Sequence, residues 1–152
     1  MKQVFLSTIL VSVAFLNHAI AQEVPVFKKD GVVIPNEESH GATLSILNKP
    51  DSTFDFATAV ATFAPGKKLD WHSHPGGQIL IITEGTGYYQ EKGKAKQIVH
   101  KGDVIVCLPG VEHWHGASPD SMFTYIAISP TQKGNTIWLQ KITDEEYNSP
   151  VQ

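Results

Sequence analysis

The chain has 152 residues, a formal net charge of −3 at pH 7 and one cysteine, Cys107. All 12 basic residues are lysines, and the absence of arginine and of a basic excess argues against nucleic acid as a partner. A lone cysteine excludes an internal disulfide, and its place in an apolar run predicts a small buried side chain.

The first residues have the pattern of a secretory signal peptide. Lys2 gives a positive start, Val4 to Leu16 is mostly apolar, and Ala19-Ile20-Ala21 is a small-x-small cleavage site. The apolar run is too short to cross about 30 Å of hydrocarbon, which disfavours a membrane anchor. We therefore expect residues 1–21 to be removed, near Ala21-Gln22, and residues 22–152 to form one domain. That domain would be periplasmic or secreted, with no membrane contact.

Short segments separated by Gly, Pro, Asn and Asp follow, the pattern of an all-β barrel or sandwich. In chain order, strands are expected at residues 41–48, 54–63, 68–74, 78–83, 87–90, 97–100, 104–108, 122–129 and 136–140. In the second of these, one face carries Phe54, Phe56, Thr58, Val60 and Thr62. A capping box from Thr143 to Glu146 predicts a short C-terminal helical turn. The residues before the first strand suit an arm that adds to a sheet edge, and exposed edges favour a homodimer.

Two histidine pairs carry the chemistry of this sequence. His72 and His74 lie two residues apart, so a strand places both imidazoles on one face. A Pro-Gly-Gly turn then allows Gln78 to face the same point, and His113 and His115 repeat the i, i+2 spacing further along the chain. Imidazole is the commonest metal ligand in proteins, so three histidines and one amide oxygen predict a divalent-metal site.

The first of these clusters resembles the first cupin motif, G-x5-H-x-H-x3,4-E-x6-G. It is matched by Gly66, His72, His74 and Gly85, with Gln78 in the place of the glutamate. The cupins are small double-stranded β-helix, or jelly-roll, barrels, and this is the fold that the resemblance implies.

The second cluster resembles the second cupin motif, G-x5-P-x-G-x2-H-x3-N. Gly102, Gly110 and His113 match it, while Leu108 and Ala117 stand in place of the proline and the asparagine. Two motifs in the right order and a short distance apart make the resemblance specific. Glycines at the strand junctions, such as Gly102, are expected to need a positive φ or a tight turn.

Nearly the whole mature chain is similar to the small cupins associated with carboxymuconolactone decarboxylases. Some relatives of that group are manganese-dependent hydroxynitrile lyases with a three-His, one-Gln metal site. The resemblance implies the metal ligands His72, His74, Gln78 and His113, with manganese as the first expectation and iron, zinc, nickel or cobalt as alternatives. Those lyases carry a histidine where this chain has Tyr125. Because tyrosine has a pKa near 10, it donates a proton readily but is a poor base at neutral pH. Cyanohydrin chemistry is therefore one option among several.

Two further residues are candidates for catalysis. His115 alternates with His113 and is expected to move a proton at the cavity mouth or to bond a backbone carbonyl. Tyr125 is expected to face the cavity, as a hydroxyl donor to substrate or as a core tyrosine. Other residues have ordinary roles: Trp71, Trp114 and Trp138 are expected to pack, and His40 and His100 to lie at the surface.

The leading hypothesis is a metal-dependent enzyme that acts on a small oxygenated, metal-chelating molecule. Its reaction would be of lyase or isomerase type, or of dioxygenase type with iron or manganese. One alternative is an exported protein that captures a small ligand through the metal without turnover. A metal-free β scaffold is the third hypothesis.

Overall fold

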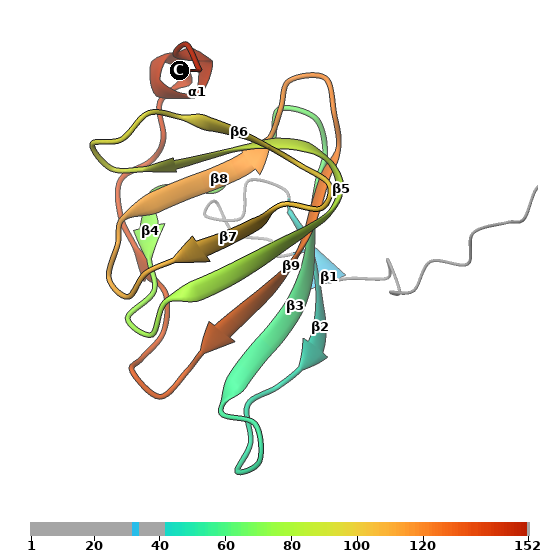
Figure 1. The fold of residues 1–152 in the computed structure, drawn as a ribbon, viewed down its shortest axis with the longest axis vertical. Helices are drawn as coiled ribbons and strands as arrows, with labels where there is room; N and C mark the ends of the chain where they lie inside the picture. The colour runs from blue at the N-terminus through green and yellow to red at the C-terminus, as the bar shows by residue number, and fades with distance from the viewer. Residues whose placement is uncertain (1–31, 34–41, 152) are drawn as a thin grey trace, which may run out of the picture.

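The computed structural model describes residues 32–33 and 42–151, so the expected signal peptide, its cleavage site and His40 lie outside the described residues. Figure 1 shows strands curling around a common interior. In chain order the elements are β1 (Val32–Val33), β2 (Thr43–Asn48), β3 (Phe56–Phe63), β4 (His72–Ser73), β5 (Gln78–Glu91), β6 (Gln97–His100), β7 (Val104–Cys107), β8 (His113–Ala117), β9 (Phe123–Pro130), β10 (Ile137–Trp138) and α1 (Asp144–Asn148). Within this part of the chain, no helix is long and apolar enough to span a membrane.

Strand β5 belongs to two antiparallel sheets. Its first half pairs with β7 and β9, which gives a large sheet of order β7-β5-β9-β3-β2-β1. Its second half pairs with β6 and β8, which gives a small sheet of order β6-β5-β8-β4-β10. The expected all-β jelly-roll barrel with a short C-terminal helix is confirmed. β1 lies at the edge of the large sheet, as expected of an arm that adds to a sheet.

The bend that carries β5 from one sheet to the other is made at Gly85. A register shift between Ile82 and Glu84 precedes it, and Gly85 has a φ of 77°. A Cβ added at Gly85 would lie 1.7 Å from the carbonyl oxygen of Met122, so only glycine fits. The two strands expected at residues 78–83 and 87–90 are therefore one bent strand. Gly102, also expected to need a positive φ, has a φ of 99°.

Several expected strands are shorter in the structure. The segment 68–74 keeps only β4, because its backbone bonds to separate partners: the Leu69 amide donates to His115 and the Trp71 amide to Gln140. The segment 136–140 keeps only β10. The strand expected from residue 54 begins at Phe56, because the Asp51 carboxylate accepts backbone N–H bonds that hold residues 51–54 in a turn.

Two apolar clusters stabilise the barrel. The first fills its interior and includes Phe63, Leu80, Phe123 and the buried Cys107, whose expected burial is confirmed. The second comprises Trp71, Trp114, Ile142 and Tyr147, and it holds the C-terminal helix against the small sheet. Trp71 and Trp114 therefore pack, as expected. The capping box at Thr143 and Glu146 is also present.

Candidate metal centre and its cavity

Three histidines from two neighbouring strands converge inside the barrel. β4 pairs with β8 so that His72 lies directly opposite His113, and His74 follows β4. One ring nitrogen from each of the three lies within 4.8 Å of the others, and all three side chains are buried. The ring centroid of His72 is 4.4 Å from that of His113 and 5.2 Å from that of His74. This group could hold a metal ion.

Backbone carbonyls fix which nitrogen of two histidines points inward. His72 Nδ1 donates to the carbonyl oxygen of Asp70 at 2.7 Å, and His113 Nδ1 donates to that of Val111 at 2.9 Å. Because a carbonyl only accepts, Nδ1 carries the proton in both rings and Nε2 keeps its lone pair. Nε2 of His113 is buried and has no hydrogen-bond partner among the described residues. These are the orientation and tautomer that metal coordination requires.

His74 and Gln78 complete the group of candidate donors. His74 Nδ1 lies 3.2 Å from the Thr136 hydroxyl, which leaves its buried Nε2 without a partner among the described residues. The Gln78 amide nitrogen donates to Ser129 Oγ at 3.1 Å, so the amide oxygen faces away from that hydroxyl. That oxygen is likewise buried and unpartnered within the described chain. Buried polar atoms are normally satisfied, so this concentration of unpartnered donors fits a bound cation.

The donor set also suits the charge of a divalent ion. Burial, and to a smaller extent the neighbouring His113, lower the pKa of His74 to about 4 against the opposing effect of the Gln78 side chain. Burial lowers the pKa of His113, and burial together with His113 holds the pKa of His72 well below its usual range. The imidazoles are therefore neutral at pH 7, the form that binds a metal. Three neutral imidazoles and an amide leave the full charge of the metal for an oxygen-rich ligand.

His115 lies beside this group but is not one of its three members. Its ring centroid is 5.1 Å from that of His72 and 5.1 Å from that of Tyr125. Both of its ring nitrogens are buried and lack partners among the described residues. Burial also holds its pKa well below the usual range, and burial raises that of Tyr125. At neutral pH His115 is therefore an uncharged imidazole and Tyr125 a protonated phenol.

Three of the four candidate donors border a cavity of about 310 Å³. His72, His74, Gln78, His115 and Tyr125 line it. Apolar side chains form most of the remaining wall, among them Leu44, Ala57, Ala59, Ala61, Phe63 and Trp138. No lysine, aspartate or glutamate is among the described residues that line the cavity. The cavity therefore combines a group of polar donors with a largely apolar wall.

Trp138 and Thr136 are among the residues of this site that were missed from the sequence. Trp138, expected only to pack, lies opposite His72 in the β4–β10 pair, and the two ring centroids are 5.0 Å apart. It lines the cavity, so the expectation of a simple packing role is corrected. Thr136, which contacts His74, was not singled out. Both come from a segment more than sixty residues further along the chain, and no local pattern connects it with β4.

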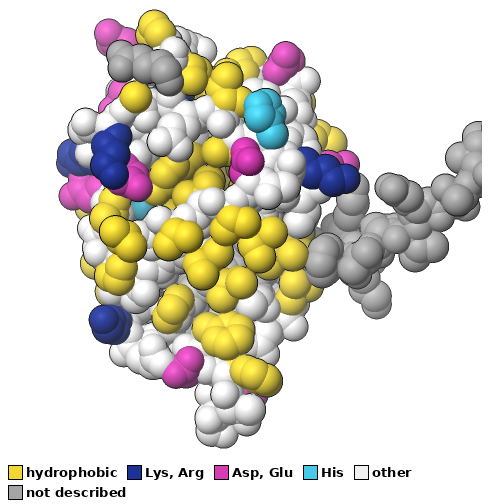
Figure 2. Space-filling view, viewed as in Figure 1, with side chains coloured by type: hydrophobic (Ala, Val, Ile, Leu, Met, Phe, Trp, Pro, Cys, Tyr) yellow, Lys and Arg dark blue, Asp and Glu magenta, His cyan; other side chains and the backbone are white. Residues whose placement is uncertain are grey.

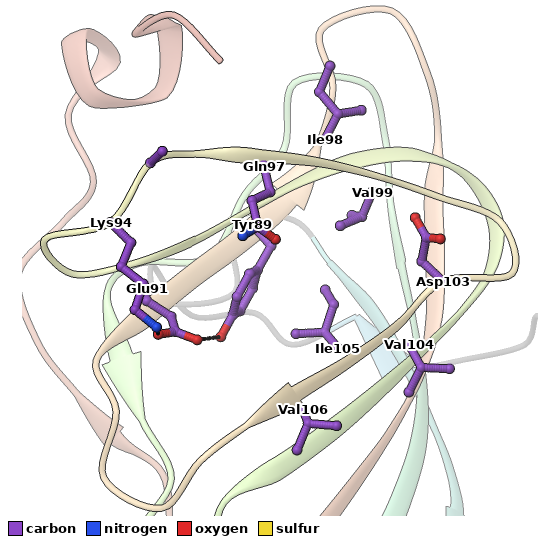
Figure 3. Close-up of a pocket in the computed structure, with 11 residues that line it drawn as sticks. Tyr89, Glu91, Lys94, Gln97, Ile98, Val99, Asp103, Val104, Ile105 and Val106 are labelled. Atoms are coloured by element: carbon purple, nitrogen blue, oxygen red, sulfur yellow. Dashed lines mark hydrogen bonds and ion pairs between the residues drawn. The ribbon is translucent and has the colours of Figure 1, made fainter. Parts of the chain in front are cut away.

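A second cavity, of about 360 Å³, opens between β6 and β7 (Figure 3). Its floor includes Tyr89, whose hydroxyl donates to Glu91 at 3.2 Å, and Glu91 in turn pairs with Lys94. The Tyr89 ring lies 5.7 Å from that of His113 and so stands between this cavity and the histidines. No histidine is among the described residues that line it. The metal centre therefore belongs to the first cavity.

Comparison with known proteins agrees with this geometry. A family described as "Cupin domain" matches residues 59–129. An (R)-mandelonitrile lyase from Granulicella tundricola is 45% identical over 103 residues, which are 67% of this chain and 78% of that protein. The chain belongs to the cupin family.

Two solved structures illustrate how far the likeness to known folds extends. A cupin-like protein from Thermotoga maritima superposes with a TM-score of 0.74 and 40% identity, over 80% of this chain and 93% of the other. A polyketide cyclase from Streptomyces resistomycificus superposes with a TM-score of 0.63 over 80% of this chain and 88% of the other, at 15% identity. The second likeness concerns the fold alone.

Proposed function

We propose that this cupin is an exported, metal-dependent lyase that acts on a small oxygenated molecule able to chelate the metal. One observation carries the proposal: buried donor atoms with no hydrogen-bond partner among the described residues converge beside an uncharged, largely apolar cavity. No charged side chain is among the described residues of the lining, so only the metal would balance a charge on the substrate. The favoured substrate has oxygen donors at one end and an apolar group at the other.

His72, His74, Gln78 and His113 are the residues proposed to hold the metal, with manganese as the first candidate. When bound, a divalent ion supplies a Lewis acid that polarises a carbonyl or alkoxide oxygen. His115 is placed to accept a proton, since it lines the cavity and keeps two buried nitrogens free of other described groups. Tyr125 is placed to donate a hydrogen bond to a substrate oxygen, because burial keeps its hydroxyl protonated.

The name of the Granulicella relative makes a cyanohydrin the first substrate to test. The apolar wall around Ala57, Ala59 and Ala61 suits the aryl group of such a molecule. Hydroxy acids and diols form the second group to test, because they share the two-oxygen chelating end. Dioxygenase chemistry would be recognised by oxygen consumption that accompanies turnover.

The test begins with elemental analysis of protein isolated without added metal, followed by turnover assays on these substrates. We expect turnover to disappear on chelation and to return with one metal, and His72→Ala to remove both metal and turnover. Tyr125→Phe is expected to keep the metal and to lower kcat. Binding of a ligand that requires the metal but never gives product would contradict the lyase hypothesis. It would favour a protein that captures a ligand through the metal.

Export is proposed from the N-terminal sequence alone. Expression of the full chain in a bacterial host, followed by mass spectrometry of the protein in the periplasm and medium, tests it. A mature chain that begins near Gln22 is the expected product. Intact chain confined to the cytoplasm would contradict export.

A further inference from the structure

The chain has three tryptophans, and they differ in how much of each indole the fold uses. Trp71 and Trp114 are 4% and 0% exposed, and both belong to the apolar cluster that holds the C-terminal helix. Their indole N–H groups are also satisfied, since that of Trp71 donates to Glu146 and that of Trp114 donates to Gln90. These two side chains are therefore structural.

The fold uses the third indole, that of Trp138, only in part. Trp138 is 38% exposed, and its N–H group has no hydrogen-bond partner among the described residues. Its ring contacts that of His72 at a centroid distance of 5.0 Å and an angle of 44° between the planes. The β4–β10 pair and the bond from the Leu139 amide to the Trp71 carbonyl fix its backbone. The indole is thus held in place while part of its surface stays uncovered.

The uncovered surface of Trp138 differs in position from the other exposed apolar surface. Figure 2 shows hydrophobic side chains gathered over β5 and β7 in the middle of the view, where Val104 and Val106 are each 58% exposed. Neither valine lines the cavity of about 310 Å³, but Trp138 does. The phenyl and phenol rings of that lining belong to Phe63 and Tyr125, which are 0% and 3% exposed. Trp138 therefore has aromatic surface to offer to a ligand.

The large sheet gives the cavity a flat wall of small side chains. Ala57, Ala59 and Ala61 alternate along β3, and all three line the cavity. Cross-strand pairing places Ala127 of β9 beside Ala59, and Ala127 lines the cavity too. Trp138 belongs to β10 in the small sheet. The cavity therefore has a low wall of methyl groups on one sheet and an indole on the other.

We propose that Trp138 binds an aromatic ring of the substrate by stacking its indole on that ring. The inference rests on the proposed function for the chemistry at the metal, and it narrows the substrate to molecules with an aryl group. An aryl group is favoured over an alkyl chain because two stacked π-systems gain more than their buried area accounts for. Since His72 lies beside the indole, a ring stacked on Trp138 leaves the oxygen end of the same molecule close to the candidate metal ligands.

Benzyl alcohol tests this site on metal-free protein, because it carries an aryl group without a chelating pair of oxygens. In saturation-transfer NMR we expect its ring protons to receive saturation from the unchanged protein, and Trp138→Leu to remove most of that transfer. Ile137→Ala is the matched control, since Ile137 precedes Trp138 on β10, is 50% exposed and does not line the cavity. Equal transfer in the unchanged and Trp138→Leu proteins would overturn the proposal.

Tryptophan fluorescence reads the same contact without any variant. Benzyl alcohol is expected to change the emission of the unchanged protein, and the change must come from Trp138 because the indoles of Trp71 and Trp114 are buried in the other cluster. Emission that stays constant up to saturating benzyl alcohol would overturn the proposal.

Calorimetry on manganese-loaded protein separates recognition of the ring from binding to the metal. Benzohydroxamate and acetohydroxamate chelate through the same two oxygens and differ only in a phenyl or a methyl group. Trp138→Leu should weaken benzohydroxamate by about 10-fold and acetohydroxamate by less than about 2-fold, and Trp138→Phe should keep most of the affinity. An equal loss for both probes would overturn the proposal, because Trp138 would then act through the metal or the fold. A protein that takes up no metal but still binds benzyl alcohol through Trp138 would overturn the proposed function and support this site.

Discussion

Replacing His115 by phenylalanine should separate the stability of this protein from its activity. His115 is 1% exposed, and neither ring nitrogen has a partner among the described residues. Its ring is surrounded by other rings, including those of Phe63 and Tyr125 at 6.4 Å and 5.1 Å. A phenyl ring keeps these contacts, and its extra atom has room because His115 borders the cavity.

The size of the stability change follows from the two ring nitrogens that His115→Phe removes. An unsatisfied buried polar group costs about 1–3 kcal/mol, so removing two should stabilise the metal-free fold by roughly 2 kcal/mol after some loss to repacking. For a domain of this size that raises Tm by roughly 5–10 °C. If His115 moves the proton, kcat should fall by about 100-fold or more, while metal content stays unchanged.

Urea denaturation of chelator-treated protein measures the free energy of unfolding, and steady-state kinetics on the active substrate measures kcat. His100→Phe is the control, because His100 is exposed and should leave both quantities nearly unchanged. A less stable His115→Phe protein would refute the view that the nitrogens are unsatisfied. Unchanged kcat would refute a role for His115 in proton transfer.

Three other predictions concern single contacts. Ser129→Ala removes the hydroxyl that accepts a hydrogen bond from the Gln78 amide and orients it. Metal affinity, measured by titration, should therefore fall by about 10-fold with little loss of fold stability. Unchanged affinity would mean that Gln78 is not a ligand. Tyr147→Phe deletes a buried hydroxyl that donates to a carbonyl of β8 at 2.7 Å, which should cost about 1–2 kcal/mol at pH 7. Burial raises the pKa of Tyr147 to about 12. The stability that the tyrosine adds over phenylalanine is therefore complete below its ordinary pKa of about 10 and is lost as the pH rises through 12. A stability difference between the two proteins that does not change with pH would contradict this. Gly85→Ala forces a Cβ against a backbone carbonyl at positive φ and should cost about 3 kcal/mol or more in urea denaturation, whereas a neutral result would exclude this bend.

The sequence predicted several features because each depends on neighbours within a few residues. The alternation of a strand places His72 and His74 on one face whatever surrounds them. The capping box at Thr143 needs only the residue three positions later, and it is present as expected. Strand lengths were less predictable, because Lys68 to His74 divides its hydrogen bonds among distant partners. Two expected strands became one because a bulge and Gly85 bend the chain without ending its pairing.

By itself the sequence determined the β-rich class of the fold and the two histidine pairs, since side-chain period and motif spacing are local properties of the chain. Only closure of the barrel decided that His113 lies opposite His72 and that Trp138 and Thr136 border the histidines. The same closure placed Val106, Ile79 and Ile128 side by side on three strands of the large sheet. The physical reason is that the register between strands depends on how distant segments pack together, so it cannot be predicted from a short stretch of sequence.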